Sequence, residues 1–167
     1  MSLGTPRDLF VHELSDLMSA EHIMLKTMQD MASVTDNASF RKSLQDHAKE
    51  TETQIERLTK VFELLGESPE ETTCPAAEGL KEEHESLKKE NPSGNVKELG
   101  LLAGANKSEH YEIATYLTLR QMAQDLGETD IADMLNESLQ EEKEMARAAQ
   151  SLAADIGAEV KKSEKVS

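Results

Sequence analysis

The 167-residue sequence has no tryptophan, a single cysteine, two tyrosines and three phenylalanines. The lone Cys74 has no partner for a disulfide within the chain, and this scarcity excludes a cysteine-rich zinc module. It favours a reducing, cytoplasmic location. Basic residues are also scarce, since 18 Lys and Arg face 33 Asp and Glu for a net charge of −15. We therefore expect no nucleic-acid or membrane partner, whereas metal cations and basic proteins stay open.

Long hydrophobic runs are missing as well. No apolar stretch approaches the ~20 residues of a membrane-spanning helix. The first eight residues carry no hydrophobic segment before their acidic side chain, so we expect no signal peptide. What the chain does have is 37% apolar residues at regular spacing, a composition typical of a folded, helix-rich domain.

The first half of the chain predicts a helical hairpin. Thr5-Pro6 is an N-cap followed by proline at the first helical position, and the apolar face continues to about Ala32. A turn at residues 35–39 offers several N-cap residue types before a second helix. Gly66 is the expected C-cap of that helix.

The second half predicts another hairpin after a long connection over residues 67–95. Within the connection, residues 76–90 predict a short acidic helix lying across the bundle. Long helices are predicted at about 96–126 and about 129–156, the last one closing at Gly157.

Two helical hairpins joined by a long crossover are the layout of a ferritin-like four-helix bundle. We therefore expect an all-α fold, with one domain over residues 5–157. Residues 158–167 are charged and lack an apolar stripe, which predicts a flexible C-terminal tail.

Several glutamates fall on the buried faces of these helices. At 100° per residue, Glu21 lies in the middle of the apolar stripe of the first helix, and Glu142 does so in the last. Glu109 lines up with apolar residues of the third long helix, and Glu112 follows one turn later, slightly to one side. All four are therefore candidates for the protein interior.

The second helix contributes His47, which points inward, and Glu50, which lies at the border of the apolar face. A buried carboxylate costs several kcal/mol unless it is neutralised, paired or bound to a metal. Because four helices deliver acidic groups to a similar depth, cations must offset their repulsion. Carboxylates with little nitrogen suit a two-metal centre of Fe, with Mn as the alternative. The candidate ligands are Glu21, His47, Glu50, Glu109, Glu112 and Glu142.

A purely structural interpretation also exists. The buried carboxylates would then be held by Arg120 or by a tyrosine hydroxyl, and His47 would simply be hydrogen-bonded. Tyr116 projects towards the acidic cluster, where it is a candidate outer partner of a ligand, and Arg120 is a candidate partner of an outer carboxylate. No residue is assigned a catalytic role.

Several stretches carry a family resemblance, the most specific being Glu109-His110-Tyr111-Glu112-Ile113-Ala114. With them, the sequence resembles the YciF/YciE-type (DUF892) stress-protein family of the ferritin-like and rubrerythrin-like superfamily. The other shared stretches are Leu14-Ser15-Asp16, Ser19-Ala20-Glu21, Glu50-Thr51, Gln54-Ile55-Glu56-Arg57, Cys74-Pro75-Ala76-Ala77-Glu78-Gly79-Leu80, Tyr116, Leu139 and Glu141-Glu142-Lys143.

The resemblance implies a ferritin-like bundle, a di-iron site and a role linked to stress, without implying an enzyme. It also marks a departure. The superfamily pattern Glu-x-x-His would require histidine at Thr53 and Met145, and His47 is the candidate for the missing nitrogen.

The leading hypothesis is a stress-related di-iron or di-manganese carboxylate protein that binds iron or oxidises Fe(II) with oxygen or peroxide. The alternatives are a non-catalytic metal-binding stress protein and a structural interaction module without metal. A homodimer is expected, because Leu101, Leu117 and Leu119 are apolar residues available for a partner subunit.

Overall fold

The computed structural model describes residues 3–164, except for the side chains of residue 159 and residues 162–164. This part of the chain is entirely helical and contains no strand. Its helices are α1 (Pro6–Val34), α2 (Ala38–Leu65), α3 (Pro75–Glu90), α4 (Gly94–Asp125) and α5 (Thr129–Glu164). The all-α, ferritin-like fold is thus confirmed, and no helix in the described part is long and apolar enough to cross a membrane.

Local chemistry sets the helix ends. The Thr5 side chain accepts a hydrogen bond from the Asp8 backbone N–H while the Asp8 carboxylate accepts from the Thr5 N–H, which forms a capping box. Asn37 caps α2 through the Phe40 N–H. Gly66 ends α2 with a φ of 69°, a left-handed conformation that suits a residue without a Cβ atom.

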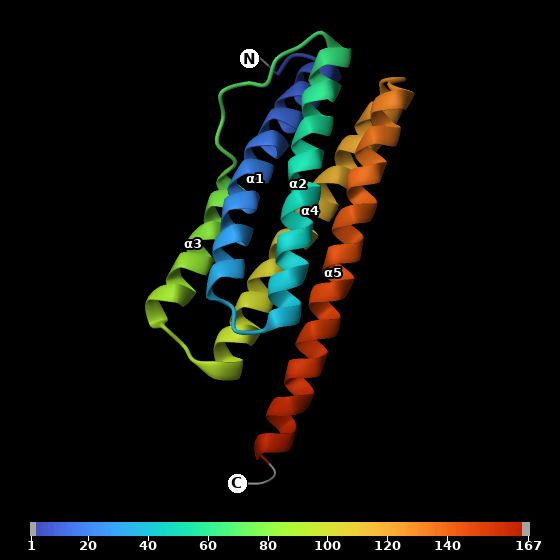
Figure 1. Cartoon of the computed structure of the whole chain (residues 1–167). Helices are drawn as coiled ribbons and strands as arrows, with labels where there is room; N and C mark the ends of the chain where they lie inside the picture. The colour runs from blue at the N-terminus through green and yellow to red at the C-terminus, as the bar shows by residue number, and fades with distance from the viewer. Residues whose placement is uncertain (1–2, 165–167) are drawn as a thin grey trace.

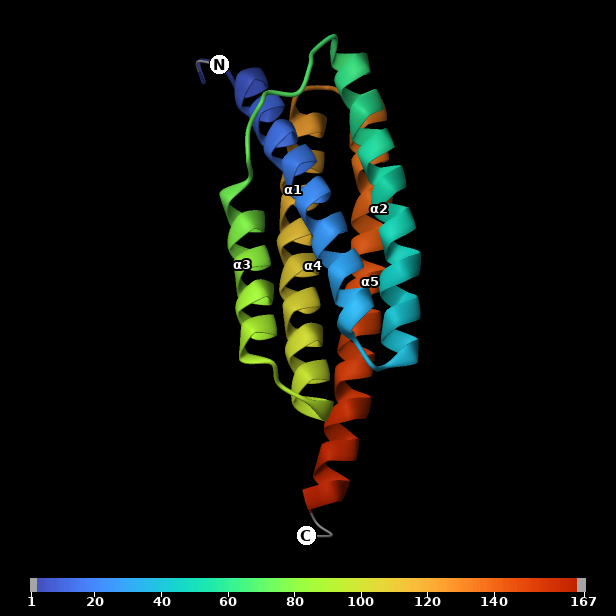
Figure 2. The same cartoon turned by 60° about the vertical axis from the view of Figure 1, so that its left-hand side comes forward.

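The two long hairpins, α1–α2 and α4–α5, pack side by side as a four-helix bundle (Figures 1 and 2). The crossover helix α3 lies along the outside of α1 and α4, roughly parallel to them, rather than across the bundle as the sequence predicted (Figure 2). The start of α4 is held at the turn between α1 and α2. There the buried Glu98 carboxylate accepts hydrogen bonds from the Thr35 hydroxyl and, at 2.8 Å, from the Asp36 N–H.

The predicted end of the last helix at Gly157 is wrong, because α5 continues to Glu164. One glycine costs a helix only about 1 kcal/mol, and Ile156 and Val160 pack on the core on either side of it. In Figure 1 this end of α5 projects past the other helices. Residues 165–167 of the predicted tail lie outside the described part.

The interior holds two apolar clusters along the bundle axis. One contains Phe10, Leu14, Leu58, Leu135 and their neighbours, and the other contains Met28, Phe40, Leu44 and Leu102. A smaller third cluster lies under α3 around Cys74 and Ala77. Between the two large clusters every long helix of the bundle places polar side chains, and this layer forms the candidate site.

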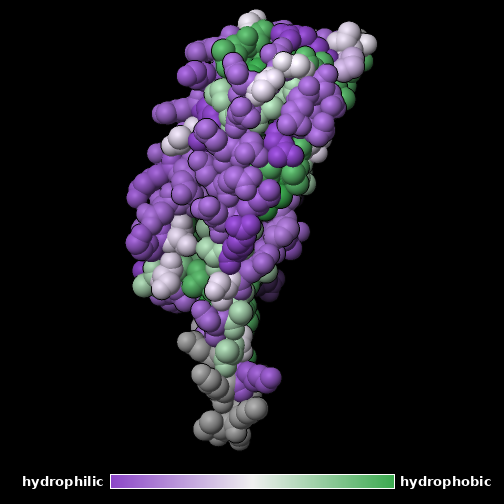
Figure 3. Space-filling model, turned by 90° about the vertical axis from the view of Figure 1, so that its right-hand side faces the viewer, coloured by the Kyte–Doolittle hydropathy of each residue, from purple (hydrophilic) through white to green (hydrophobic). Residues whose placement is uncertain are grey.

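The surface carries the surplus of acidic side chains. The face seen from the right of Figure 1, the side on which α5 lies, is largely hydrophilic with scattered apolar residues (Figure 3). Leu101 and Leu119, which were predicted for a partner surface, are 1% exposed and belong to the core of the chain itself. Leu117 is 40% exposed, so of the three leucines it alone is available to the predicted homodimer.

Candidate metal centre

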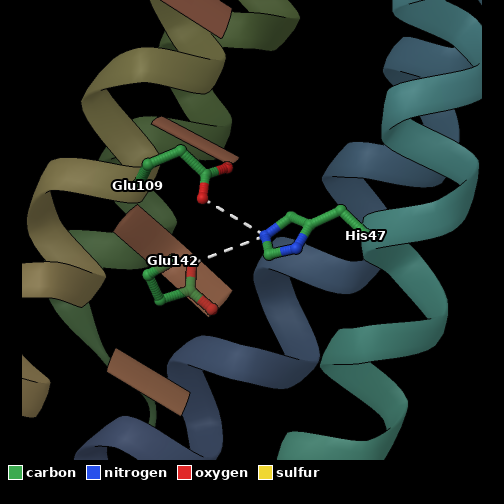
Figure 4. A group of neighbouring side chains, drawn as sticks. All are labelled: His47, Glu109 and Glu142. Atoms are coloured by element: carbon green, nitrogen blue, oxygen red, sulfur yellow. Dashed lines mark ion pairs between the residues drawn. The ribbon is translucent and has the colours of Figure 1, made fainter. Parts of the chain in front are cut away.

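His47 of α2 lies at the centre of the polar layer. Its Nε2 atom is 3.2 Å from Oε2 of Glu109 on α4 and 3.4 Å from Oε2 of Glu142 on α5 (Figure 4). One ligand atom from each of the three residues fits within 4.8 Å of the others, and all three side chains are buried. Three helices therefore converge on one point.

Two more glutamates enter this layer, one from α1 and one from α4. Glu21 of α1 is fully buried, and its Oε1 atom accepts a short hydrogen bond from the Tyr116 hydroxyl of α4. Glu112 lies one turn after Glu109 and is 2% exposed, so the sideways position expected from its helical wheel does not bring it to solvent. The periodicity argument correctly placed the carboxyl groups of Glu21, Glu109, Glu112 and Glu142 inside the bundle.

Glu50 occupies a different place. Its side chain is 51% exposed, and its Oε2 atom is 3.0 Å from Nδ1 of His47, on the edge of the ring opposite to Nε2. Glu50 therefore contacts the imidazole and not the Glu109 and Glu142 carboxyl groups. This arrangement fixes the orientation of the ring, as carboxylates commonly do for metal-binding histidines.

An outer layer of α2 residues holds α5 in register. The Gln54 amide donates to Glu142 at 2.6 Å and to Glu141 at 3.0 Å. Arg57 donates to Ser138 at 2.6 Å and forms an ion pair with Glu141 at 3.0 Å. Glu141 is thus engaged by Arg57 and Gln54 rather than by His47.

The arginine predicted to support this site was the wrong one. Arg120 does not reach an acidic group of the centre but donates to the Asn136 side chain at 3.1 Å. Arg57 fills the supporting role instead, and its pairing depends on how α2 lies against α5. A helical wheel of one helix contains no such information.

Burial dominates the acid–base behaviour of the centre. It raises the pKa of Glu21 to about 8, with a further contribution from the nearby Glu142 carboxylate. Burial likewise raises the pKa of Glu109 to about 8, although His47 opposes the shift. The pKa of Glu112 rises well above its usual range because the residue is buried beside Glu142 and Glu21. With no cation bound, Glu21 and Glu109 therefore hold protons at neutral pH.

The remaining pair behaves in the opposite way. Burial alone would lower the pKa of His47, but the facing Glu109, Glu142 and Glu50 groups outweigh it and raise that pKa. Burial would raise the pKa of Glu142, yet the contacts with His47 and Gln54 outweigh it and lower that pKa. An imidazolium facing a carboxylate is thus the charged core of the centre when no cation is bound.

The donor set fits a metal. Within the polar layer, four carboxylate or imidazole atoms are buried without a hydrogen-bond partner: Glu21 Oε2, His47 Nε2, Glu109 Oε2 and Glu142 Oε2. His47 Nε2 lies within ion-pair distance of Glu109 Oε2 and Glu142 Oε2, but neither contact has the geometry of a hydrogen bond. Buried polar groups are rarely left unsatisfied, and those that are need a cause. Carboxylate oxygens with one imidazole suit Fe or Mn.

Another buried histidine escaped the sequence analysis. His84 of α3 is 4% exposed, and its Nε2 atom lies 2.6 Å from Asp30 on α1, which Lys88 also contacts at 2.7 Å. These contacts hold the crossover helix on the bundle. The acidic segment around His84 carries no apolar pattern that would distinguish the buried histidine from its exposed neighbours.

Comparison with known proteins agrees with this architecture. The chain is 38% identical to protein YciF of Escherichia coli strain K12 over 144 residues, which cover 86% of this chain and 87% of the relative. The crystal structure of the E. coli stress protein YciF superposes with a TM-score of 0.90 at 35% identity, covering 93% of this chain and 98% of that one.

Two further structures are similar. The YcfI protein of Rhodopseudomonas palustris gives a TM-score of 0.86 at 36% identity and covers 89% of this chain and 95% of its own. A protein of Xanthomonas campestris shares the fold, with a TM-score of 0.75 at 23% identity over 96% and 99% of the two chains. The model of the family described as "Domain of unknown function (DUF892)" matches residues 5–161. The chain therefore belongs to the DUF892 family, that of the stress protein YciF.

Proposed function

We propose that this protein binds a pair of iron or manganese ions in the polar layer of its bundle and oxidises Fe(II) there during stress. The observation that supports the proposal is the convergence of His47, Glu109 and Glu142. Their ligand atoms lie within 4.8 Å of one another, and all three side chains are buried. Cations neutralise the repulsion of buried carboxylates that no described basic side chain other than His47 approaches closely.

The geometry favours different roles for the candidate ligands. His47, Glu109 and Glu142 would hold one ion, and the neighbouring Glu21 and Glu112 carboxylates would complete the place for a second. Glu50 would orient the His47 ring from its outer edge, in place of the ligand role predicted from sequence. Gln54 and Tyr116 would each fix one oxygen of a ligand, leaving the other oxygen of Glu142 or Glu21 for the metal.

Bound Fe(II) would supply the electrons for reducing oxygen or peroxide. The chain contributes the enclosure, because the surrounding apolar clusters keep bulk water away from the ions. It also contributes proton storage: Glu21 and Glu109, whose pKa values are about 8, release protons when a cation displaces them and take them up when it leaves. The fixed Tyr116 contact keeps Glu21 pointing into the layer.

Metal analysis tests the binding step. Protein produced in iron- or manganese-supplemented medium is expected to carry up to two ions per chain by elemental analysis, with anomalous scattering at the polar layer. Glu142→Gln should lose most of the metal, whereas Glu144→Gln, an exposed neighbour on the same helix, should keep it. Metal-free wild-type protein, or full occupancy in Glu142→Gln, would contradict the proposal.

Oxygen consumption tests the oxidation step separately. Metal-free protein mixed with Fe(II) should consume oxygen or peroxide faster than Fe(II) in buffer, and Glu142→Gln should fall to the buffer rate. Tight iron binding without such consumption would identify a non-catalytic metal-binding protein. A melting temperature that neither metal nor chelator changes would instead favour a structural module, since a ligand specific for the native state must raise it.

A further inference from the structure

A small cavity adjoins the polar layer on the side of α1 and α4. Its volume is about 10 Å³, and Glu109 and Glu112 form one end of it. A space of this size holds roughly one water-sized molecule. The cavity therefore lies directly beside two of the proposed ligands.

The walls of the cavity are apolar. Three methionines of α1, Met24, Met28 and Met31, line it together with Leu44 and Ala105. The three methionines recur at helical spacing and are at most 6% exposed. Such walls offer weak sulfur contacts and no strong hydrogen-bond donor to an ion or a polar molecule.

Two hydroxyl groups also line the cavity, but both donate to their own helices. Thr27 donates to the Ile23 carbonyl at 2.9 Å, and Ser108 donates to the Gly104 carbonyl at 3.3 Å. Their hydrogens are thus not directed at the cavity. A hydrated cation entering here would lose its water shell and find few replacement ligands before it reached the carboxyl groups. Entry by this side would therefore have a high energetic cost.

The crossover helix α3 lies outside this seam between α1 and α4 (Figure 2). Met24 lines the cavity and also belongs to the cluster under α3 with Cys74 and Ala77. Further along, Leu87 of α3 packs so closely on Gly100 of α4 that a Cβ atom there would lie 2.8 Å from the leucine. The crossover helix thus packs on apolar residues beside the cavity.

Figure 4 shows His47 reaching the centre from α2, and Glu50 contacts the outer edge of that ring. The Glu50 side chain is half-exposed and negatively charged, which suits the entry of a cation. The two sides of the centre therefore differ in kind: the Glu50 side is acidic and half-exposed, and the cavity side is lined mostly by methionine and other apolar residues.

From this difference we propose that dioxygen binds in the methionine-lined cavity and reaches the metal centre from there. This inference rests on the proposed function. Dioxygen is uncharged, is about the size of the cavity and needs no hydrogen-bond donor. Hydrogen peroxide needs hydrogen-bond partners, so we assign its entry to the half-exposed Glu50 side.

Xenon binding tests the cavity without any metal. Xenon occupies dry apolar cavities and is a heavy scatterer. Crystals pressurised with xenon should show an anomalous peak between Met28 and Ala105, in metal-loaded and metal-free protein alike. The absence of a xenon peak, or an ordered water filling the space on Glu109 or Glu112, would overturn the proposal. Elemental analysis of the same protein reports separately on the proposed metal site.

Filling the cavity tests its use. Ala105→Leu should abolish the xenon peak, keep the bound iron and slow oxidation by dioxygen at least tenfold, while the rate with hydrogen peroxide stays within twofold. Ala132→Leu is the matched control, since Ala132 is an equally buried alanine in the other large cluster. Ala105→Val provides a smaller step if leucine prevents folding. A variant that loses xenon but reacts with dioxygen at the wild-type rate would refute the assignment.

Discussion

The two hairpins bring polar groups to the same depth of the bundle, but the surroundings of these groups differ between the hairpins. In α1–α2, each group has a dedicated partner: Glu21 accepts from the Tyr116 hydroxyl, and His47 is held by Glu50. In α4–α5, burial raises the pKa of Glu109 to about 8 and also raises that of Glu112, whereas contacts with His47 and Gln54 lower the pKa of Glu142. The first hairpin therefore sets the geometry of the centre, whereas both hairpins hold protons that a metal must displace: Glu21 and His47 on the first, and Glu109 on the second.

The largest expected effect concerns these stored protons. Binding of Fe(II) or Mn(II) must remove protons from groups such as Glu21 and Glu109, whose pKa is about 8. Each displaced proton changes the affinity tenfold per pH unit. We therefore expect Mn(II) to bind at least about a hundredfold more tightly at pH 8 than at pH 6, measured by calorimetry in buffers of different ionisation enthalpy. A pH-independent affinity would mean that the carboxyl groups are already ionised.

The same protons determine the stability of the metal-free protein. The pKa of Glu21 rises from 4.5 to about 8 on folding, so the folded state binds more protons than the unfolded state in this range. The stabilisation is complete below pH 4.5 and is lost as the pH rises through 8. The melting temperature without metal should therefore fall between pH 6 and pH 8, and Mn(II) should reverse the fall at pH 8. Equal melting temperatures at both pH values would contradict this sign.

The geometric role of the first hairpin can be broken at Glu50. Glu50→Ala should weaken metal binding about tenfold to a hundredfold, because the His47 ring loses the group that orients it. Glu50→Gln should recover part of this loss, since an amide oxygen still accepts a hydrogen bond from Nδ1. Glu52→Ala, an exposed acid on the same helix, is the control. An unchanged affinity in Glu50→Ala would remove Glu50 from the site.

Replacing a proton-storing group of the second hairpin should improve stability at the expense of binding. Glu112→Leu removes a buried carboxyl group, and we expect the metal-free protein to gain about 1–3 kcal/mol. For a chain of this size that corresponds to roughly 2–4 °C per kcal/mol in the melting temperature. The increase in melting temperature that metal binding causes should be smaller in this variant than in the wild type. Destabilisation without metal would show that Glu112 has a structural partner.

The smallest effect is expected at Tyr116. Tyr116→Phe leaves the Glu21 carboxyl group without its donor and should cost about 1 kcal/mol, observed as a lower melting temperature of the metal-free protein. Metal content should remain unchanged, because the phenol does not itself hold an ion in the proposed site. Loss of metal in this variant would move Tyr116 into the binding machinery.

Features encoded by neighbouring residues could be predicted from the sequence. Helical spacing indicated which glutamates face inward, and Gly66 marked the end of α2 correctly. Gly157 misled the same reasoning, because a glycine inside a helix is tolerated when its neighbours pack on a core. The burial of Glu21 and Glu142 thus followed from local pattern, whereas the end of α5 depended on tertiary contacts.

Contacts between helices were beyond the sequence. Gln54 and Arg57 meet α5 only because α2 lies against it in one register, and the sequence favoured Arg120 for that role. His84 is buried where its ring contacts Asp30, which is 54 positions away along the chain. The outer position of Glu50 also required the structure, since a wheel places the residue at a border but does not indicate which edge of His47 it contacts.

Cys74 gives the crossover helix a built-in reporter. Its sulfur is fully buried at the start of α3 and contacts the Tyr111 hydroxyl at 3.0 Å, and burial raises the pKa of the thiol. A thiol in this state reacts slowly, because the thiolate is the reactive form. Since the sequence has no other cysteine, the rate at which a maleimide labels Cys74 in the native protein reports how often α3 detaches from the bundle.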